Sequence, residues 1–187
     1  MILRYRLFIF LKLEYSSEMI QEAKYQDAES IQNLIRIFSE TGKVLFRSID
    51  DIRENIADFI VYKENDQTVG ACSLKTGWGR LAEIRSLGVD PRYLGQGIGT
   101  KMLEASIETA LLTDCDTLFV LTYSVSMFER LGFSIVDKET LPHKVWNDCK
   151  ACLHQANCDE TAMIFSLVSL RNKQSTQVSM PAILNAR

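Results

Sequence analysis

The sequence has no excess of basic residues and no apolar run long enough to cross a membrane. Its 187 residues include 21 lysines and arginines and 24 aspartates and glutamates, which gives a formal net charge of −3. A chain of this charge has no general attraction for nucleic acid or for an anionic membrane surface. We therefore expect neither nucleic acid nor a membrane among its partners.

The cysteines do not suit a disulfide scaffold. There are five of them, an odd number. The apolar run 7–13 near the N-terminus is interrupted by Lys12, and no small-residue cleavage site follows it. A chain without a secretory signal and with unpaired cysteine numbers is typical of a reducing compartment, so we predict a cytoplasmic location.

Internal repeats and a dividing linker are also lacking, so we predict a single soluble domain. Hydrophobic residues make up 47% of the chain and charged residues 24%, which is enough apolar chain for one buried core. We assign this domain to residues 19–170. Residues 1–18 are interpreted as an N-terminal extension that need not be native to the domain, and residues 171–187 as a flexible tail.

Within the domain, the hydrophobic periodicity alternates between that of strands and that of helices, which predicts a mixed α/β (α+β) fold. Asp27 can cap a helix whose apolar residues share one face, namely Ile31, Leu34, Ile35 and Phe38. A short helix from Asp50 and helices at 97–112 and 126–132 follow, with an irregular stretch at 138–159. Strands are predicted at 19–25, 58–64, 68–75, 81–89, 117–123, 133–137 and 161–170.

The segment before the helix at 97–112 holds three glycines in five positions, Gly95, Gly97 and Gly99. A dinucleotide fingerprint fails because its third glycine would fall on Thr100, and a Walker loop fails because Lys101 follows Thr100. Permissive glycines at a helix start are the plain alternative, although each costs about 1 kcal/mol inside a helix. Bare N–H groups at a helix N-terminus can instead surround a phosphate. This pattern favours a pyrophosphate ligand.

The stretch GVDPRYLGQGIGTKML resembles the acyl-CoA signature V-x-P-x-x-[RQ]-G-x-G-I-G-x-x-L of the GNAT N-acetyltransferases. The resemblance covers about residues 19–170 and implies the GNAT acyl-CoA N-acyltransferase fold, a mixed central sheet flanked by helices. It also implies acetyl-CoA as cosubstrate. Leu94 replaces the usual Arg or Gln, which we expect to weaken coenzyme A binding modestly. The implied cofactor-binding residues are Leu87, Val89, Leu94, Gly95, Gln96, Gly97, Ile98, Gly99 and Thr100.

The strand before the glycine loop carries two charges, Glu83 and Arg85, on one face. Simple alternation places them with Leu81, Leu87 and Val89, and places Ala82, Ile84, Ser86 and Gly88 on the other face. A solvated sheet face or a Glu83–Arg85 ion pair would explain the charges without a function. A polar site for a small substrate is the interpretation we favour, because a covered face of a central strand is normally apolar.

An amine must lose a proton before it can be acylated, and Glu83 is the candidate general base, directly or through water. A glutamate at this point of the strand often has that role in GNAT enzymes. Many members also place a tyrosine where this chain has Phe128, to protonate the departing thiolate. Tyr123 is the candidate substitute, with packing at a strand end as its plain alternative.

The segments AEIRSLGV, FVLTY, TGKVLFRSIDDI and KETLPHKVWNDCKACLHQANCDETAM are similar to the short stand-alone bacterial N-acetylglutamate synthases. The resemblance implies transfer of acetyl to the α-amino group of L-glutamate, in arginine biosynthesis. Two substrate carboxylates need cationic partners, for which Arg47, Arg85 and Lys144 are the candidates. A homodimer, another small amine or a protein N-terminus as acceptor, and a non-enzymatic coenzyme A sensor remain open.

A cluster of thiols and imidazoles lies in the irregular stretch. Cys149, Cys152 and Cys158 could form a Cys₃His zinc site with His154. Their spacing is tighter than in common zinc modules, and a second CxxC pair is lacking. We expect reduced thiols here and no metal.

Overall fold

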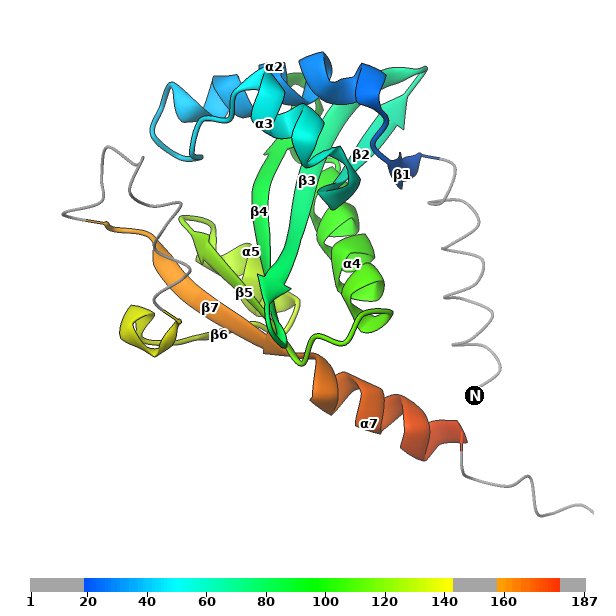
Figure 1. Ribbon diagram of the computed structural model, residues 1–187, viewed down its shortest axis with the longest axis vertical. Helices are drawn as coiled ribbons and strands as arrows, with labels where there is room; N and C mark the ends of the chain where they lie inside the picture. Colours follow the sequence, from blue (N-terminus) through cyan, green and yellow to red (C-terminus); the bar gives the residue numbers. More distant parts are fainter. Residues whose placement is uncertain (1–18, 143–157, 179–187) are drawn as a thin grey trace, which may run out of the picture.

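The structure, a computed structural model, describes residues 19–142 and 158–178, with side chains as far as residue 172. A seven-stranded sheet forms the centre of the described chain, with helices on both faces (Figure 1). The strands are β1 (Ile20–Glu22), β2 (Phe59–Glu64), β3 (Gln67–Trp78), β4 (Leu81–Val89), β5 (Thr117–Thr122), β6 (Ser134–Ile135) and β7 (Thr161–Ser166). The helices are α2 (Ala28–Ser39), α3 (Ile49–Glu54), α4 (Ile98–Leu111), α5 (Val125–Arg130) and α7 (Leu167–Val178), with 3₁₀ turns η1 (Tyr25–Asp27), η2 (Ile56–Asp58), η3 (Pro91–Tyr93) and η4 (Lys138–Thr140).

The sheet order is β1-β2-β3-β4-β5-β7-β6, and the predicted mixed sheet is confirmed. Neighbouring strands run antiparallel except for β4 and β5, which are parallel. The crossover that parallel pairing requires contains the glycine loop and α4. The junction between β4 and β5 is therefore where the two antiparallel parts of the sheet, β1-β2-β3-β4 and β5-β7-β6, meet.

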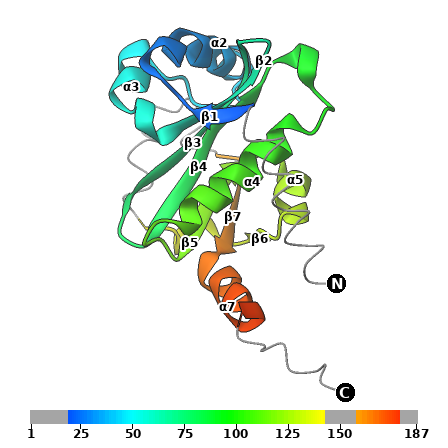
Figure 2. The same ribbon diagram turned by 90° about the vertical axis from the view of Figure 1, so that its right-hand side faces the viewer.

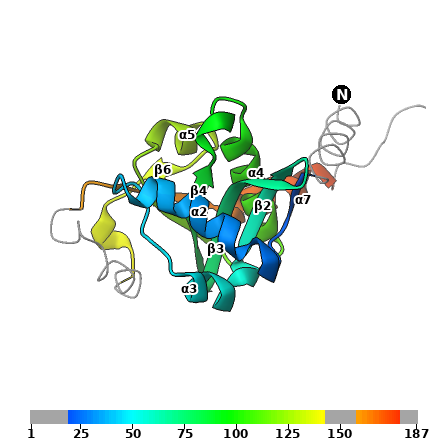
Figure 3. The same cartoon turned by 90° about the horizontal axis from the view of Figure 1, so that it is seen from above.

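Two helical layers cover the sheet (Figures 2 and 3). Helices α2 and α3 bury Ile31, Ile35 and Ile52 against one face of β2 and β3. Met102 and Leu103 of α4 belong to the core on the opposite face, together with Phe128 of α5 and other buried side chains of the sheet. The apolar face predicted for the first helix is confirmed at Ile31, Leu34 and Ile35, whereas Phe38 is only half-buried. None of the helices within the described ranges is long and apolar enough to cross a membrane.

Some predicted local features differ in the structure. Strand β3 continues through Gly77 to Trp78, so the turn into β4 is shorter than the predicted one. Asp27 precedes α2, but its side chain does not cap that helix. Its carboxylate instead accepts hydrogen bonds from the Lys24 amide at 2.8 Å and pairs with Lys63 Nζ at 2.8 Å. The Asp27 carboxylate therefore caps the preceding turn η1 and forms a tertiary ion pair, and it does not cap α2.

The last predicted strand is wrong beyond Ser166. Strand β7 ends there, and α7 begins at Leu167 and continues past Leu170, where we had placed the end of the domain. Ser166 Oγ accepts a hydrogen bond from the Ser169 amide at 3.3 Å, which is the contact of a helix N-cap. A serine before an apolar run was the sequence signal for this helix.

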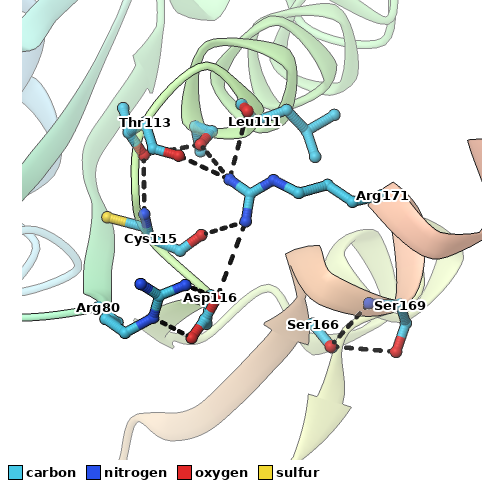
Figure 4. Close-up of polar contacts among 9 residues, drawn as sticks. Arg80, Leu111, Thr113, Cys115, Asp116, Ser166, Ser169 and Arg171 are labelled. Carbon is cyan, nitrogen blue, oxygen red and sulfur yellow. Dashed lines mark hydrogen bonds and ion pairs between the residues drawn. The ribbon is translucent and has the colours of Figure 1, made fainter. Parts of the chain in front are cut away.

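Arg171 of α7 ties this helix to the C-terminal end of α4 (Figure 4). Its Nη1 donates to the Cys115 carbonyl at 2.8 Å, and its Nη2 donates to the Thr113 carbonyl at 2.7 Å and the Leu111 carbonyl at 3.3 Å. Asp116 lies 3.8 Å from Nη1 and also pairs with Arg80. A cation at the negative end of a helix dipole satisfies carbonyls that the helix itself leaves without partners.

We expect Arg171→Ala to lower the free energy of unfolding by about 2–4 kcal/mol, because several carbonyls lose a charged donor. For a chain of this size that corresponds to a fall in Tm of about 5–15 °C, measured by calorimetry. Arg130→Ala, which removes an exposed arginine of α5, is the control and should change Tm little. Equal effects of the two substitutions would contradict a special role for Arg171.

Candidate active site

The candidate site is built where β4 and β5 separate. Their ladder joins only Leu81–Glu83 of β4 to Thr117–Phe119 of β5, and the rest of β4, residues 84–89, has no partner residue in β5. Figure 1 shows β4 and β5 diverging beyond their short paired stretch. The glycine loop follows directly at the far end of β4. The edge of residues 84–89 that faces β5 is therefore unpaired, and it leads directly into the backbone of the glycine loop.

The backbone of the glycine loop exposes a row of N–H groups. Gly95 and Gly97 have φ values of 79° and 77°, and Gly97 is the N-cap of α4. Only glycine adopts this left-handed conformation without strain. Among the described residues, no acceptor contacts the N–H groups of 95–100, whereas the Leu94 amide donates to the Pro91 carbonyl at 3.4 Å. The set of available amides therefore begins at Gly95.

The three glycines have different structural roles. A Cβ added at Gly95 or Gly97 would meet no protein atom within 4 Å, so open space adjoins both. Gly99 has an ordinary φ, and a Cβ there would make van der Waals contacts with Met127 at 3.7 Å and Val89 at 3.9 Å. Anion binding by this loop thus depends on the conformation of Gly95 and Gly97, and Gly99 is not required on conformational grounds.

The remaining predicted cofactor-binding residues lie around the loop. Leu94 and Gln96 are exposed, Thr100 is half-buried in the first turn of α4, and Ile98 is buried. Leu87 and Val89 pack on the face of β4 that α4 covers. Leu94 presents an apolar side chain at a position where the signature has a polar one, and it contributes no charge to the loop.

A bulge in β4 corrects our prediction of its two faces. Ala71 pairs with Gly88 and Ser73 pairs with Arg85, so the single residue between them on β3 opposes two residues on β4. Ser86, one of those two, has a φ of 53°. Alternation therefore inverts at this point. Leu81, Glu83 and Arg85 do share one face as predicted, but Leu87 and Val89 join Ala82 and Ile84 on the α4 side.

Glu83 and Arg85 point to the face opposite α4. Arg85 Nη1 lies 3.9 Å from a Glu83 carboxylate oxygen, and the two side chains are only 10% and 14% exposed. The ion pair that we considered as the plain alternative is present. Because both side chains are largely removed from solvent, the pair differs from an ordinary surface salt bridge. It places a proton acceptor and a guanidinium at the fork between β4 and β5.

A polar relay that we did not predict connects Arg47 to this face. Lys75 is the β3 partner of Glu83, and its Nζ donates to Asn55 Oδ1 at 2.7 Å and pairs with Asp58 at 2.9 Å. Asn55 contacts Asp51, whose carboxylate lies 3.5 Å from Arg47 Nη1. Directly paired residues share a face of a sheet. Arg47 is thereby linked through α3 to the face that carries Glu83.

Tyr123 follows β5 directly and is partly exposed. Its hydroxyl donates to Asp159 Oδ1 at 2.7 Å, and this hydrogen bond, together with partial desolvation and the nearby carboxylates, raises the pKa of Tyr123 well above its usual range. Phe128, in the place of the usual tyrosine, is buried and stacks edge-to-face on Phe133 with ring centroids 5.2 Å apart. Phe128 is therefore a core residue.

Some of the predicted residues lie outside the described chain, namely Lys144, Cys149, Cys152 and His154. Cys158 is described and carries a free thiol whose Sγ lies 3.9 Å from a Glu160 carboxylate oxygen. No group of metal-binding side chains is found within residues 19–142 and 158–172. The possible zinc site stays untested.

The order of strands, the forked β4–β5 junction and the glycine loop before α4 can now be compared with known proteins. The model of the Acetyltransferase (GNAT) family matches residues 21–133. The chain belongs to this family. It is an N-acetyltransferase that uses acetyl-CoA as cosubstrate, and the predicted fold and enzyme class are confirmed.

Two relatives of this GNAT acetyltransferase and one solved structure illustrate the likeness. An uncharacterised N-acetyltransferase of Chlorobaculum tepidum is 34% identical over 148 residues, covering 79% of this chain and 96% of that protein. An amino-acid acetyltransferase of Mycobacterium tuberculosis is 27% identical over 134 residues, covering 70% and 76%. A crystal structure of N-acetylglutamate synthase from Neisseria gonorrhoeae with coenzyme A and N-acetyl-glutamate has a TM-score of 0.72 at 25% identity, covering 79% of this chain and 34% of that one.

Proposed function

We propose that this GNAT acetyltransferase transfers the acetyl group of acetyl-CoA to the α-amino group of an amino acid, and that L-glutamate is the acceptor. The observation that carries the proposal is the pairing of Glu83 with Arg85 on a largely buried face at the β4–β5 fork. A carboxylate beside a guanidinium suits an acceptor that carries both an amine and a carboxylate. The relatives named amino-acid acetyltransferase and the Neisseria gonorrhoeae synthase complex support it.

The glycine loop suits the diphosphate of acetyl-CoA. The N–H groups of 95–100 have no acceptor among the described residues, and they lie at the start of a 14-residue helix. Charge-assisted hydrogen bonds from these amides and the positive end of the helix dipole would hold the diphosphate. This arrangement explains why Leu94 is tolerated, because main-chain groups supply the contacts.

Glu83 is proposed as the general base. The acceptor amine gives a proton to the Glu83 carboxylate, directly or through water, and its lone pair then attacks the thioester carbonyl carbon. A C–N bond forms, the C–S bond breaks and the sulfur leaves as a thiolate, while the nitrogen, which after the attack still carries one proton too many for an amide, loses that second proton to water. Tyr123 is the candidate donor of a proton to that thiolate, although its hydroxyl is engaged with Asp159 and must change partner first. Release of the thiolate without protonation is the alternative.

Arg47 and Arg85 are proposed to bind the acceptor carboxylates, with Lys144 as a third candidate outside the described chain. Guanidinium groups match carboxylates bidentately, which gives orientation as well as affinity. Alignment of amine and thioester accounts for up to about 7–11 kcal/mol of the barrier, more than proton removal does. The two arginines are therefore as important to the proposal as Glu83.

The test is thiol release from acetyl-CoA with a panel of acceptors. We expect L-glutamate to give a kcat/KM at least about 10-fold above that of glutamine and of neutral amino acids, because a lost charge-assisted contact costs 1.5–3 kcal/mol. Mass spectrometry would identify N-acetyl-glutamate as product. Equal rates on neutral amino acids would overturn glutamate specificity. Activity on peptide N-termini alone would overturn amino-acid acetylation.

A further inference from the structure

The end of α3 holds a neutral side chain between two charged ones. Asn55 is the C-cap of α3 and lies between Asp51, one turn earlier, and Lys75 of β3. Its Oδ1 accepts from Lys75 Nζ at 2.7 Å. Its Nδ2 donates to the Asp51 carbonyl at 2.9 Å and to Asp51 Oδ1 at 3.3 Å. One amide thus serves a cation on one side and an anion on the other.

The chemistry of the two neighbours explains why an amide occupies this position. A lysine ammonium has only donors, and an ionised carboxylate has only acceptors. A carboxylate at position 55 would accept from Lys75 but would face the Asp51 carboxylate. A cationic side chain would donate to Asp51 but would face the Lys75 ammonium, and an apolar side chain would bind neither Asp51 nor Lys75. Of the side chains of this length, only the amide completes both contacts.

Each end of this contact leads to a proposed substrate-binding or catalytic group. Lys75 is the cross-strand partner of Glu83, and Asp51 Oδ2 lies 3.5 Å from Arg47 Nη1. Ser48 caps α3 by accepting from the Asp51 amide at 3.1 Å, and Gln32 of α2 donates to the Arg47 carbonyl at 3.3 Å. The backbone around Arg47 is therefore fixed by local contacts. Its side chain contacts the Asp51 carboxylate, which is one of the groups that can set its orientation.

We infer that Asn55 is a positioning residue, which sets the orientation of Arg47 relative to Glu83 through Asp51 and Lys75. The inference rests on the proposed function, because it assigns Asn55 to the binding of an amino-acid carboxylate by Arg47. The inference extends that function, because the affinity for the amino-acid acceptor would then depend on Asn55, for which we propose no contact with either substrate. Acetyl-CoA binding at the glycine loop is not part of this relay.

The decisive variant is Asn55→Asp, which is nearly isosteric and keeps a partner for Lys75 but sets two carboxylates against each other. We expect the KM for L-glutamate to rise about 3- to 10-fold, the range of one hydrogen bond, with the KM for acetyl-CoA unchanged. The double variant Asp51→Asn with Asn55→Asp keeps the net charge and reverses the amide and the carboxylate. Asn at 51 can donate to Asp at 55 and accept from Arg47, so most of the lost affinity should return.

Arg53→Gln is the matched structural control, since Arg53 also lies on α3 and pairs with Glu29 at 3.7 Å. It should change Tm without changing the KM for L-glutamate. An unchanged glutamate KM in Asn55→Asp, or failure of the double variant to recover it, would overturn the positioning role. If the wild-type enzyme acetylates no amino acid at all, the proposed function fails instead, so the two outcomes are distinguishable.

Discussion

Replacing Glu83 by Gln should lower the kcat of acetyl transfer by about 10²- to 10⁴-fold, the contribution typical of general-base catalysis. Glutamine keeps the shape of the side chain and can still contact Arg85, which lies 3.9 Å from the carboxylate. It cannot take a proton from the acceptor amine. The binding of acetyl-CoA, measured by calorimetry, should stay within about 2-fold because the glycine loop is untouched.

Two comparisons separate loss of the base from loss of structure. Glu22→Gln removes an exposed carboxylate of β1, far from the fork in the order of strands, and should leave kcat unchanged. In Glu83→Gln, raising the pH should recover part of the rate, because more of the free amine is then deprotonated without a base. A variant with wild-type kcat would remove Glu83 from the mechanism and leave Arg85 and the loop to explain catalysis by alignment alone.

The sequence predicted those structural features of the candidate site that depend on residues close together in the chain. Strand β4 has the predicted bounds, and the glycine segment lies directly before α4 as predicted, with Gly95 and Gly97 in a left-handed conformation. Glu83 and Arg85, two residues apart, share a face as alternation requires. Such features follow from local periodicity and from conformations that only glycine adopts readily.

Features set by distant partners escaped prediction. The inversion of faces after Ser86 depends on how β3 pairs with β4, which periodicity within one strand does not contain. The relay through Asn55 requires the end of α3 to lie over Lys75, 20 residues further along the chain. Ser166 was a possible helix cap in the sequence, but the alternating pattern around it also suits a strand. The contacts of Arg171 with the end of α4, which favour the helix, are between residues far apart in the chain.

The fork between β4 and β5 combines features that local sequence determines with features that distant contacts determine. Only Leu81–Glu83 of β4 pairs with β5, so Glu83 is the last residue at which the two strands are joined. On one side of that point the glycine loop offers main-chain donors to a diphosphate. On the other side lie Arg85 and, linked to this face through α3, Arg47, the two arginines that we propose bind the acceptor carboxylates. Glu83, which we propose as the base, lies between the proposed sites of the two ligands.

Gly97→Ala should weaken acetyl-CoA binding by about 10- to 100-fold, since even partial loss of the charge-assisted bonds to the diphosphate costs 1.5–3 kcal/mol. Alanine at a φ of 77° is strained, and its methyl group would enter the open space beside the loop where we place the diphosphate. Calorimetric titration with acetyl-CoA measures the change. The dissociation constant should rise while the kcat at saturation falls much less.

Gly79 offers a matched control for the backbone effect. It has a φ of 72° in the exposed turn between β3 and β4, and a Cβ there also meets no protein atom within 4 Å. Gly79→Ala should therefore cost a similar amount of stability, about 1–2 kcal/mol, without touching the loop. Because the two variants share the conformational penalty, the difference in acetyl-CoA affinity between them isolates the contact with the ligand. Equal affinities of the two variants for acetyl-CoA would mean that the amides after Leu94 do not hold the diphosphate. The Arg or Gln that the signature has at this position would then be important for binding, and its replacement by Leu94 would remove a contact that the loop does not supply.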